Sequence, residues 1–211
     1  MKETDQYLEQ FERLTGQDRQ SSWVYPLRKA GMARFAELGF PTLQQEDWRF
    51  TNVAPIAKLP FKPLAKAPAQ EVTAETITKL TFGTLPAIRL VFLNGHFVPE
   101  LSTPAQPVPG VVITNLASAL SSDSPVAKAH LAQYARGETN AFVAMNEAFF
   151  QDGGFIHVPA GKRVETPVHL LFLSTAKEMG STAQPRNLIV DSGKDRWLFT
   201  VAPTVSIEFD F

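Results

Sequence analysis

The spacing of apolar residues changes along this chain, and the change limits the folds that are available to it. Near the amino terminus apolar side chains recur every three to four positions, which is the period of an amphipathic helix. The first such stripe consists of Tyr7, Leu8, Phe11 and Leu14, and Gly16 follows it. A second helix is predicted from Pro26 to Gly39, because proline suits the first turn of a helix and glycine its C-terminal cap. The chain therefore begins with a helical region.

A proline-rich stretch and then a new pattern follow. Four prolines fall between Pro55 and Pro68, which excludes a helix interior or a central strand there, so we expect a linker or an extended strap. From about Pro86 short runs of β-prone residues replace the helical pattern. The run 88–93 followed by Asn94-Gly95 predicts a hairpin, because both central residues of a type I′ turn need positive φ.

The rest of the chain mixes two predicted helices with several short strands. A strand is expected at 111–113, one helix from Pro125 to near Gly137, and another from Ala141 to Phe150 that Asn140 caps. Further apolar pieces at 155–158, 164, 168–173 and 188–190 are separated by tight corners and predict strands. Short strands with no helix between them suit a coiled parallel solenoid as well as a sandwich, and periodicity alone does not choose.

Charge and composition exclude several classes of function. Twenty basic and 21 acidic side chains leave a formal net charge of −1 in 211 residues, without the positive excess typical of proteins that bind nucleic acid or anionic membranes. No apolar run approaches the roughly 18 residues of a membrane span, and the acidic amino terminus does not resemble a signal peptide. We therefore expect a cytoplasmic protein that binds neither nucleic acid nor membrane.

The chain contains no cysteine. It therefore has no disulfide, thiolate zinc site, cysteine nucleophile or cysteine-ligated cluster of its own. Its four histidines are His96, His130, His157 and His169, and their spacing does not fit a dedicated set of metal ligands. His157 and His169 either face each other on neighbouring strands or both point to solvent. We expect no metal site.

Other candidates have structural explanations that we favour. Glu46 and Asp47 are adjacent, so on a helix they point about 100° apart and do not converge for acid–base catalysis. Glu46 is expected to cap a turn or to meet Arg49. Trp48 and Phe50 could form a binding platform, but packing is the favoured interpretation.

Two polar residues interrupt the apolar helix that begins at Ala141. They are Asn146 and Glu147, and either could be functional. We expect Asn146 to bond to backbone instead, because a buried amide needs a hydrogen-bond partner. Gly153-Gly154 does not form a phosphate cradle, since the Lys-Ser/Thr pair and the following helix of a P-loop are missing.

Several stretches together resemble one known family. They are LRKA at 27–30, GFPT at 39–42, EDWRFT at 46–51, VFLNGHF at 91–97, AFVAMNEAF at 141–149, DGGFIHVP at 152–159, VETPVHL at 164–170 and PRNLIV at 185–190. In this order they cover about residues 26–190, and they resemble the SufD branch of the SufB/SufD family of iron–sulfur cluster assembly proteins.

The resemblance implies an α+β fold in which a helical domain lies beside a right-handed parallel β-helix. We expect a helical domain in residues 1–54 and a proline-rich linker with a short helix in 55–85. Residues 86–211 are expected to form a mixed strand and helix segment that leads into the first rungs of a truncated β-helix. Members of the family are longer, and the tail from Asp191 to Phe211 does not resemble their next rungs.

The resemblance also implies a non-catalytic scaffold that pairs with a SufB-like subunit and a SufC-like ATPase. An iron–sulfur cluster is then expected only in the assembled complex, and no catalytic, cofactor-binding or metal-binding residue is assigned to this chain. An early end to a β-helix exposes a sheet edge, so a homodimer through that end, or a tail folded back as a cap, is expected.

Two alternatives stay open at this point. One is a β-solenoid carbohydrate-binding or carbohydrate-active domain, for which Glu165 and Asp191 are too isolated to form a pair of carboxylates. The other is a protein-interaction module of unrelated lineage.

Overall fold

The computed structural model of the chain describes residues 4–16, 23–64, 72–81, 86–103, 108–175, 178–193 and 205–206. They group into two compact units, each built from segments that are far apart in the sequence. Unit 1 takes residues 1–63, 131–150 and 178–184, and unit 2 takes 64–130, 151–177 and 185–211. Helices and strands both contribute, so the predicted α+β class is confirmed. The domain boundaries predicted at residues 54 and 85 divide the sequence into continuous stretches, whereas these units combine distant segments. Those boundaries stay a prediction.

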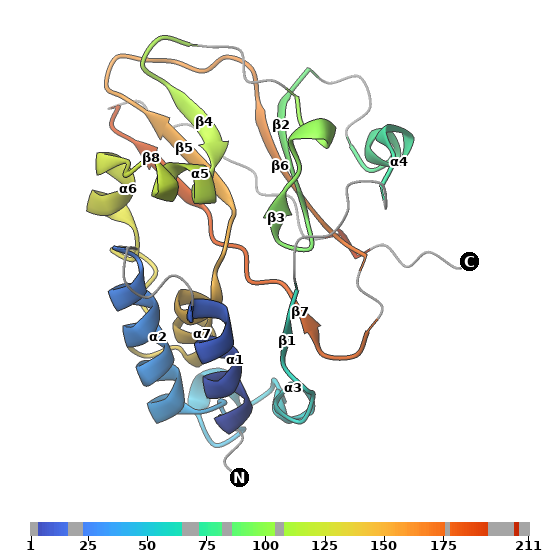
Figure 1. Cartoon of the computed structure of the whole chain (residues 1–211), viewed down its shortest axis with the longest axis vertical. Helices are drawn as coiled ribbons and strands as arrows, with labels where there is room; N and C mark the ends of the chain where they lie inside the picture. Colours follow the sequence, from blue (N-terminus) through green and yellow to red (C-terminus); the bar gives the residue numbers. More distant parts are fainter. Residues whose placement is uncertain are drawn as a thin grey trace. The chain divides into compact units, whose positions relative to one another are not determined.

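Three helices form the centre of unit 1 (Figure 1). They are α1 (Asp5–Thr15), α2 (Tyr25–Leu38) and α7 (Ala141–Phe149). Gly39 ends α2 with φ 63° and donates its N–H to the Phe35 carbonyl at 2.9 Å, as the sequence predicts. The buried core of this unit consists of Tyr7, Phe11, Met32, Phe35, Phe61, Ala141, Ala144, Met145, Ala148 and Phe149. Leu8 departs from the predicted stripe, because it is 42% exposed.

Helices α2 and α7 approach each other closely at Gly31. A Cβ atom on this glycine would lie 2.7 Å from Glu147 Cβ and 2.9 Å from the Ala144 carbonyl oxygen. Contacts this short do not occur between real side chains, so the packing of the two helices requires glycine here. At its amino end α7 is capped by Asn140, whose Oδ1 accepts the N–H groups of Phe142 and Val143 at 3.0 and 3.1 Å.

The proline-rich stretch contains short elements rather than a bare strap. A 3₁₀ turn (η1, Glu46–Trp48) precedes the single turn of α3 (Ala54–Ala57), and Pro55 lies in the first turn of α3, where no N–H is needed. Strand β1 (Lys62–Pro63) then pairs in parallel with β7 (Ser181–Thr182). The expectation that proline blocks a long helix or a central strand is met, since both elements are very short.

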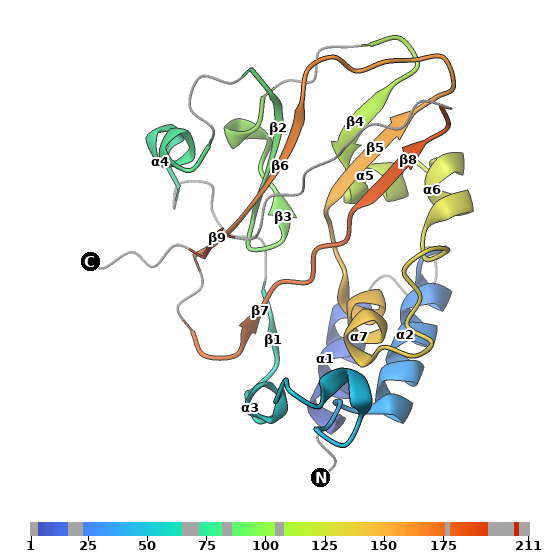
Figure 2. The same ribbon diagram turned by 180° about the vertical axis from the view of Figure 1, so that it is seen from behind.

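The described residues of unit 2 form two sheets, shown from opposite sides in Figures 1 and 2. One has the order β3-β2-β6-β9, and the other has the order β4-β5-β8. Their bounds are β2 (Ile88–Leu93), β3 (His96–Phe97), β4 (Val112–Asn115), β5 (Gly154–Val158), β6 (Val168–Ser174), β8 (Leu188–Asp191) and β9 (Val205–Ser206).

The last strands alternate between the two sheets. The chain passes from β5 to β6 in the other sheet and, after β7, to β8 beside β5 and then to β9 beside β6. The pairings of β8 with β5 and of β9 with β6 are both parallel. An up-and-down meander has antiparallel neighbours and is thereby excluded for these strands. The pairings are those that a coil needs, but the described strands form two separate sheets rather than closed rungs. The right-handed β-helix therefore stays a prediction.

The predicted hairpin is confirmed, and a continuous apolar layer lies beside it. Asn94 and Gly95 have φ of 53° and 86° between β2 and β3, as a type I′ turn requires. Phe92 stacks on its neighbour Phe172 in β6 with ring centroids 4.7 Å apart. Strands of both sheets contribute to this core, which consists of Leu90, Phe92, Ile156, Val158, Leu170 and Phe172.

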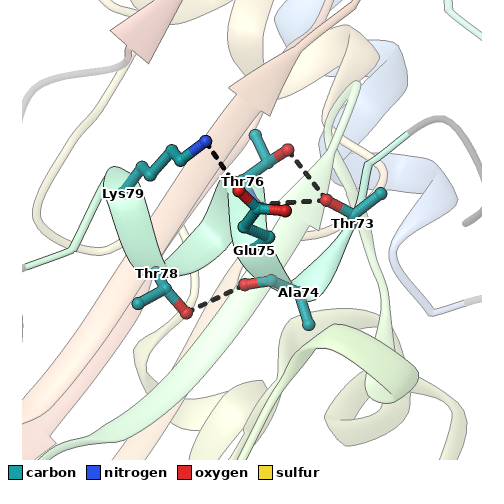
Figure 3. Close-up of polar contacts among 6 residues, drawn as sticks. All are labelled: Thr73, Ala74, Glu75, Thr76, Thr78 and Lys79. Carbon is teal, nitrogen blue, oxygen red and sulfur yellow. Dashed lines mark hydrogen bonds and ion pairs between the residues drawn. The ribbon is translucent and has the colours of Figure 1, made fainter.

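A short helix, α4 (Ala74–Lys79), covers the opposite face of β2 and β6. Its Ile77 packs in a cluster with Val91 and Leu171. Figure 3 shows how the helix begins, with Thr73 Oγ1 accepting the N–H of Thr76 at 3.2 Å. An ion pair of 2.8 Å joins Lys79 to Glu75 one turn earlier. These polar contacts lie on the exposed surface of α4, whereas the buried side chain of Ile77 packs the helix against the sheet.

The remaining elements correct four expectations. Helix α5 (Leu116–Ser121) has no counterpart among the predicted helices. Helix α6 (Pro125–His130) begins where expected but ends seven residues before Gly137, because Ala132 takes a positive φ of 59° that a helix cannot continue through. Val164, a predicted strand residue, lies in no strand, and the predicted loop from Pro99 contains a 3₁₀ turn, η3 (Pro99–Leu101).

We predict that Gly31→Leu lowers the free energy of unfolding by about 1–3 kcal/mol or more, because the side chain would enter the contact between α2 and α7. Ala33→Leu introduces the same side chain at an exposed position of the same helix and should change stability by no more than about 0.5 kcal/mol. Chemical denaturation followed by circular dichroism measures both. Equal stability of the two variants would contradict the close packing.

Candidate functional site

A buried carboxylate lies where the chain enters strand β5. Asp152 is 5% exposed and stands two residues before Gly154, the first residue of that strand. Burying a carboxylate costs free energy unless its oxygens accept hydrogen bonds. The partners of Asp152 therefore decide whether it is a structural or a reactive group.

Donors from three separate segments surround this carboxylate. The backbone N–H groups of Ala117 and Gly153 donate to Oδ1 at 2.9 and 2.8 Å, and that of Phe97 donates to Oδ2 at 3.1 Å. The side-chain amide of Asn115, itself buried, donates to both oxygens at 3.1 and 3.0 Å. Asp152 thus connects the hairpin strand β3, the start of α5 and the start of β5.

The two glycines that follow Asp152 meet a second segment. Gly154 donates its N–H to Asn187 Oδ1 at 2.7 Å, and the N–H of Arg186 donates to the main-chain carbonyl of the aspartate at 3.0 Å. A Cβ on Gly153 would overlap the Arg186 carbonyl oxygen, and one on Gly154 would lie 2.7 Å from Leu170 Cδ1. Backbone atoms therefore exclude a side chain at Gly153, whereas at Gly154 the buried side chain of Leu170 would have to move. Residues 115, 152–154 and 186–187 are called the Asp152 junction below.

The junction brings together three stretches that carry the family motifs, at 91–97, 152–159 and 185–190. Sequence reasoning assigned no role to Asp152. The signal that could have identified Asp152 is an acidic residue followed by two glycines directly before an apolar strand. An acidic residue in that position is expected to be buried, because the strand that follows it lies in the core. The oxygens of Asp152 already accept several N–H bonds, so the geometry suits a framework rather than proton transfer.

The histidines lie in different places. His96 Nε2 is 3.1 Å from the Leu64 carbonyl oxygen, and His130 is the last residue of α6. His157 is on β5 and His169 is on β6, which belong to different sheets. The two therefore do not face each other on neighbouring strands, which corrects one of the two alternatives. In the described part of the chain, no three His, Asp or Glu side chains form a group that could hold a metal ion.

His169 has a lowered pKa. It lies directly across from Arg89 in the parallel pair of β6 and β2. Burial in the sheet is the larger cause, and the positive charge of Arg89 the smaller one, and both lower the pKa of His169 below its usual 6.5. The folded protein therefore resists protonation of this ring.

The two aromatic residues of the 46–51 motif lie in different environments. Trp48 packs on Phe142, with ring centroids 5.3 Å apart, so the packing interpretation holds for it. It does not hold for Phe50, which is 92% exposed. Among the described residues the Glu46 carboxylate neither caps a turn nor pairs with Arg49, which corrects both expectations for it. Arg49 Cζ instead lies 5.5 Å from the centroid of the Phe50 ring.

The remaining candidates do not converge on a reaction site. Asn146 donates its side-chain amide to Gln184 Oε1 at 3.4 Å, and its expected bond to backbone stays a prediction. Glu147 Oε1 accepts the N–H of Gly137 at 3.2 Å. Glu165 and Asp191 are both exposed, and Asp191 Oδ1 caps its own turn by accepting the N–H two residues later at 2.8 Å.

Comparison with known proteins shows the family. Residues 1–170 match the model of the family described as SufBD protein N-terminal region, so the chain belongs to the SufBD family. It is 29% identical over 173 residues to an iron–sulfur cluster assembly SufBD family protein of Synechocystis sp., an alignment that covers 77% of this chain and 35% of that protein. It is 35% identical over 71 residues to the iron–sulfur cluster assembly protein SufB of Bacillus subtilis, covering 34% of this chain and 15% of SufB.

A third relative is an iron–sulfur cluster assembly SufBD family protein of Staphylococcus aureus, 29% identical over 84 residues, which are 40% of this chain and 18% of the relative. The chain thus matches about a third or less of the length of these curated proteins. The family resemblance stated from the motifs is confirmed, whereas the SufD branch is a finer assignment that these matches leave open. None of the helices in the described ranges has the length and hydropathy needed to cross a bilayer.

We predict that Asp152→Asn destabilises the protein by on the order of 3 kcal/mol, because an amide NH₂ would face N–H donors and leave buried groups unsatisfied. Urea denaturation of the purified variant measures the loss. Asp47→Asn makes the same change at an exposed carboxylate and should lie within about 0.5 kcal/mol of the parent. If Asp152→Asn is as stable as that control, the junction does not hold the fold together.

The lowered pKa of His169 predicts a pH dependence of stability. As pH falls below 6.5, the unfolded chain takes up a proton that the folded protein resists, so the free energy of unfolding decreases until the lowered pKa is passed. His169→Gln should flatten this decrease, and Arg89→Gln should flatten it less, because burial is the larger cause. Denaturation curves from about pH 5 to about pH 8 measure the effect. A decrease of the same slope in all three proteins would be inconsistent with the assignment.

Proposed function

We propose that this chain is the amino-terminal portion of a non-catalytic scaffold, of the SufD branch, that acts in iron–sulfur cluster assembly. The observation that carries the proposal is the family match over residues 1–170. The relatives point in the same direction, since those of Synechocystis, Bacillus subtilis and Staphylococcus aureus are described as cluster assembly proteins. The relatives include a SufB, so the SufD branch rests on the sequence motifs.

The use of polar groups in the fold supports a scaffold role. The polar side chains of the Asp152 junction form hydrogen bonds with each other and with backbone N–H groups. The parallel pairings of β8 on β5 and of β9 on β6 support a coil that continues in the same sense. In this proposal the coil is the beginning of the right-handed β-helix, and its rigidity rather than a reactive group is what the chain contributes.

An iron–sulfur cluster is cargo for such a protein. Clusters are held mostly by cysteine thiolates, and residues 1–211 contain no cysteine. We therefore propose that the cluster forms in an assembled complex with a SufB-like subunit and a SufC-like ATPase, which supply the ligands and the energy. Neither a cofactor nor an enzymatic activity is assigned to these residues.

The outer edge of β8 is a candidate site for pairing with another strand. It has no strand beside it among the described residues, because the sheet order there is β4-β5-β8. An open edge presents N–H and C=O groups that pair with another strand. We propose that a further turn of coil covers it in a longer protein, and that a second copy of the chain covers it in the 211-residue form.

The test is co-expression of the gene product with the SufB-like and SufC-like subunits of the same organism. The proposal predicts one complex of all three in size-exclusion chromatography, with no ATP hydrolysis when the SufC-like subunit is left out. Deletion of the gene should lower the activity of iron–sulfur enzymes in cells, and the wild-type gene should restore it. A product that elutes apart from both subunits, with full enzyme activity in the deletion strain, would refute the scaffold function.

A further inference from the structure

Phe50 has an exposure that the fold does not explain. Among the described residues it is the most exposed large apolar side chain, at 92%. Trp48, two residues earlier, packs on Phe142 with ring centroids 5.3 Å apart. The same short motif therefore gives one half-buried aromatic ring that packs within unit 1 and one that is exposed to solvent. Packing accounts for Trp48 and leaves Phe50 without a structural role.

The backbone holds Phe50 in a defined turn. The N–H of Trp48 donates to the Gln45 carbonyl at 3.0 Å, and the N–H of Arg49 donates to the Glu46 carbonyl at 3.2 Å. The N–H of Thr51 donates to the Trp48 carbonyl at 2.9 Å and so closes the turn around Phe50. An anchored turn loses little conformational freedom when its side chain is bound, which favours binding.

Arg49 places a positive charge on the same protrusion. Its Cζ lies over the Phe50 ring, 5.5 Å from the ring centroid, and its guanidinium carries five N–H donors. Glu46 and Asp47 are close in sequence, yet within the described ranges no carboxylate oxygen lies within 4.0 Å of Arg49. Residues 49 and 50 together, called the Arg49–Phe50 knob below, thus expose an aromatic ring beside a positive charge that has no ion-pair partner among the described residues.

We propose that the Arg49–Phe50 knob docks into another protein whose surface offers an apolar pocket with a carboxylate at its rim. The pocket takes the ring, and the carboxylate takes the guanidinium as a charge-assisted hydrogen bond. Aromatic residues and arginine are the types enriched at the centres of protein interfaces. This interaction surface goes beyond the scaffold function and does not depend on it.

The surroundings of the knob argue against other ligands. The exposed carboxylates of Glu46 and Asp47 lie three and two residues before Arg49 in the sequence, and the formal net charge of the whole chain is −1. Nucleic acid and anionic membranes bind to surfaces with a positive excess. One arginine near two acidic residues is better matched by a single carboxylate at the rim of a protein pocket than by a polyanion.

Photocrosslinking in living cells tests the proposal even though the partner is unidentified. The photoreactive p-benzoylphenylalanine replaces Phe50 in the gene product, and in a control it replaces Tyr134, which is 73% exposed in the same unit. We expect an adduct with another protein from position 50 and not from position 134. Mass spectrometry should map it to a pocket of apolar residues beside an Asp or Glu. Arg49→Glu should reduce its yield about tenfold.

Binding of the purified gene product to the mapped protein provides the second measurement. Phe50→Ala and Arg49→Glu should each weaken the affinity about tenfold or more, whereas Tyr134→Ala should leave it unchanged. Phe50 is exposed, so its variant should keep the unfolding midpoint of the parent. Several outcomes overturn the proposal: no adduct, an adduct only within the chain or with a second copy, equal yields from both positions, or unchanged affinity of Phe50→Ala.

Discussion

A carboxylate saturated with N–H donors is the constraint on which the strand-rich unit of this protein depends. Asp152 accepts bonds from the hairpin, from the strand-to-helix turn after β4 and from its own successor Gly153. Each bond fixes where one segment meets β5, and the neighbouring glycines allow Arg186 and Asn187, directly before β8, to approach closely. In a low-dielectric interior such a network is favourable only when every polar group in it has a hydrogen-bond partner. This requirement holds the hairpin and the start of α5 in fixed positions beside the start of β5.

Local signals in the sequence were sufficient where a single residue type determines the backbone. Gly39 ends α2, Asn140 caps α7 and Asn94-Gly95 form the hairpin turn, because each of these conformations is costly for most other residues. The sequence was less informative where tertiary contacts decide. The six residues of α5 are too few to show a helical period in the sequence. The end of α6 depends on a positive φ at Ala132, and an alanine in a sequence does not predict positive φ.

The candidate site shows the same division. Composition was enough to argue against a thiolate site, because the chain has no cysteine. The role of Asp152 required three-dimensional contacts, since its donors come from positions 37 and 55 residues away in the sequence. The different environments of Trp48 and Phe50 are likewise invisible in a motif that contains both as aromatic residues. Motif residues of this SufBD-family chain thus differ in environment: those of the Asp152 junction are held in the framework, whereas Phe50 is exposed.

Residue-resolved hydrogen exchange tests the central claim, that the Asp152 junction holds the framework of unit 2, most directly. The amide protons of Phe97, Ala117 and Gly154 donate at the junction. If the account is right, they exchange only through complete unfolding of the unit, with a free energy of opening that equals its unfolding free energy and falls equally with denaturant. Exchange of these amides through small local openings, insensitive to denaturant, would contradict it.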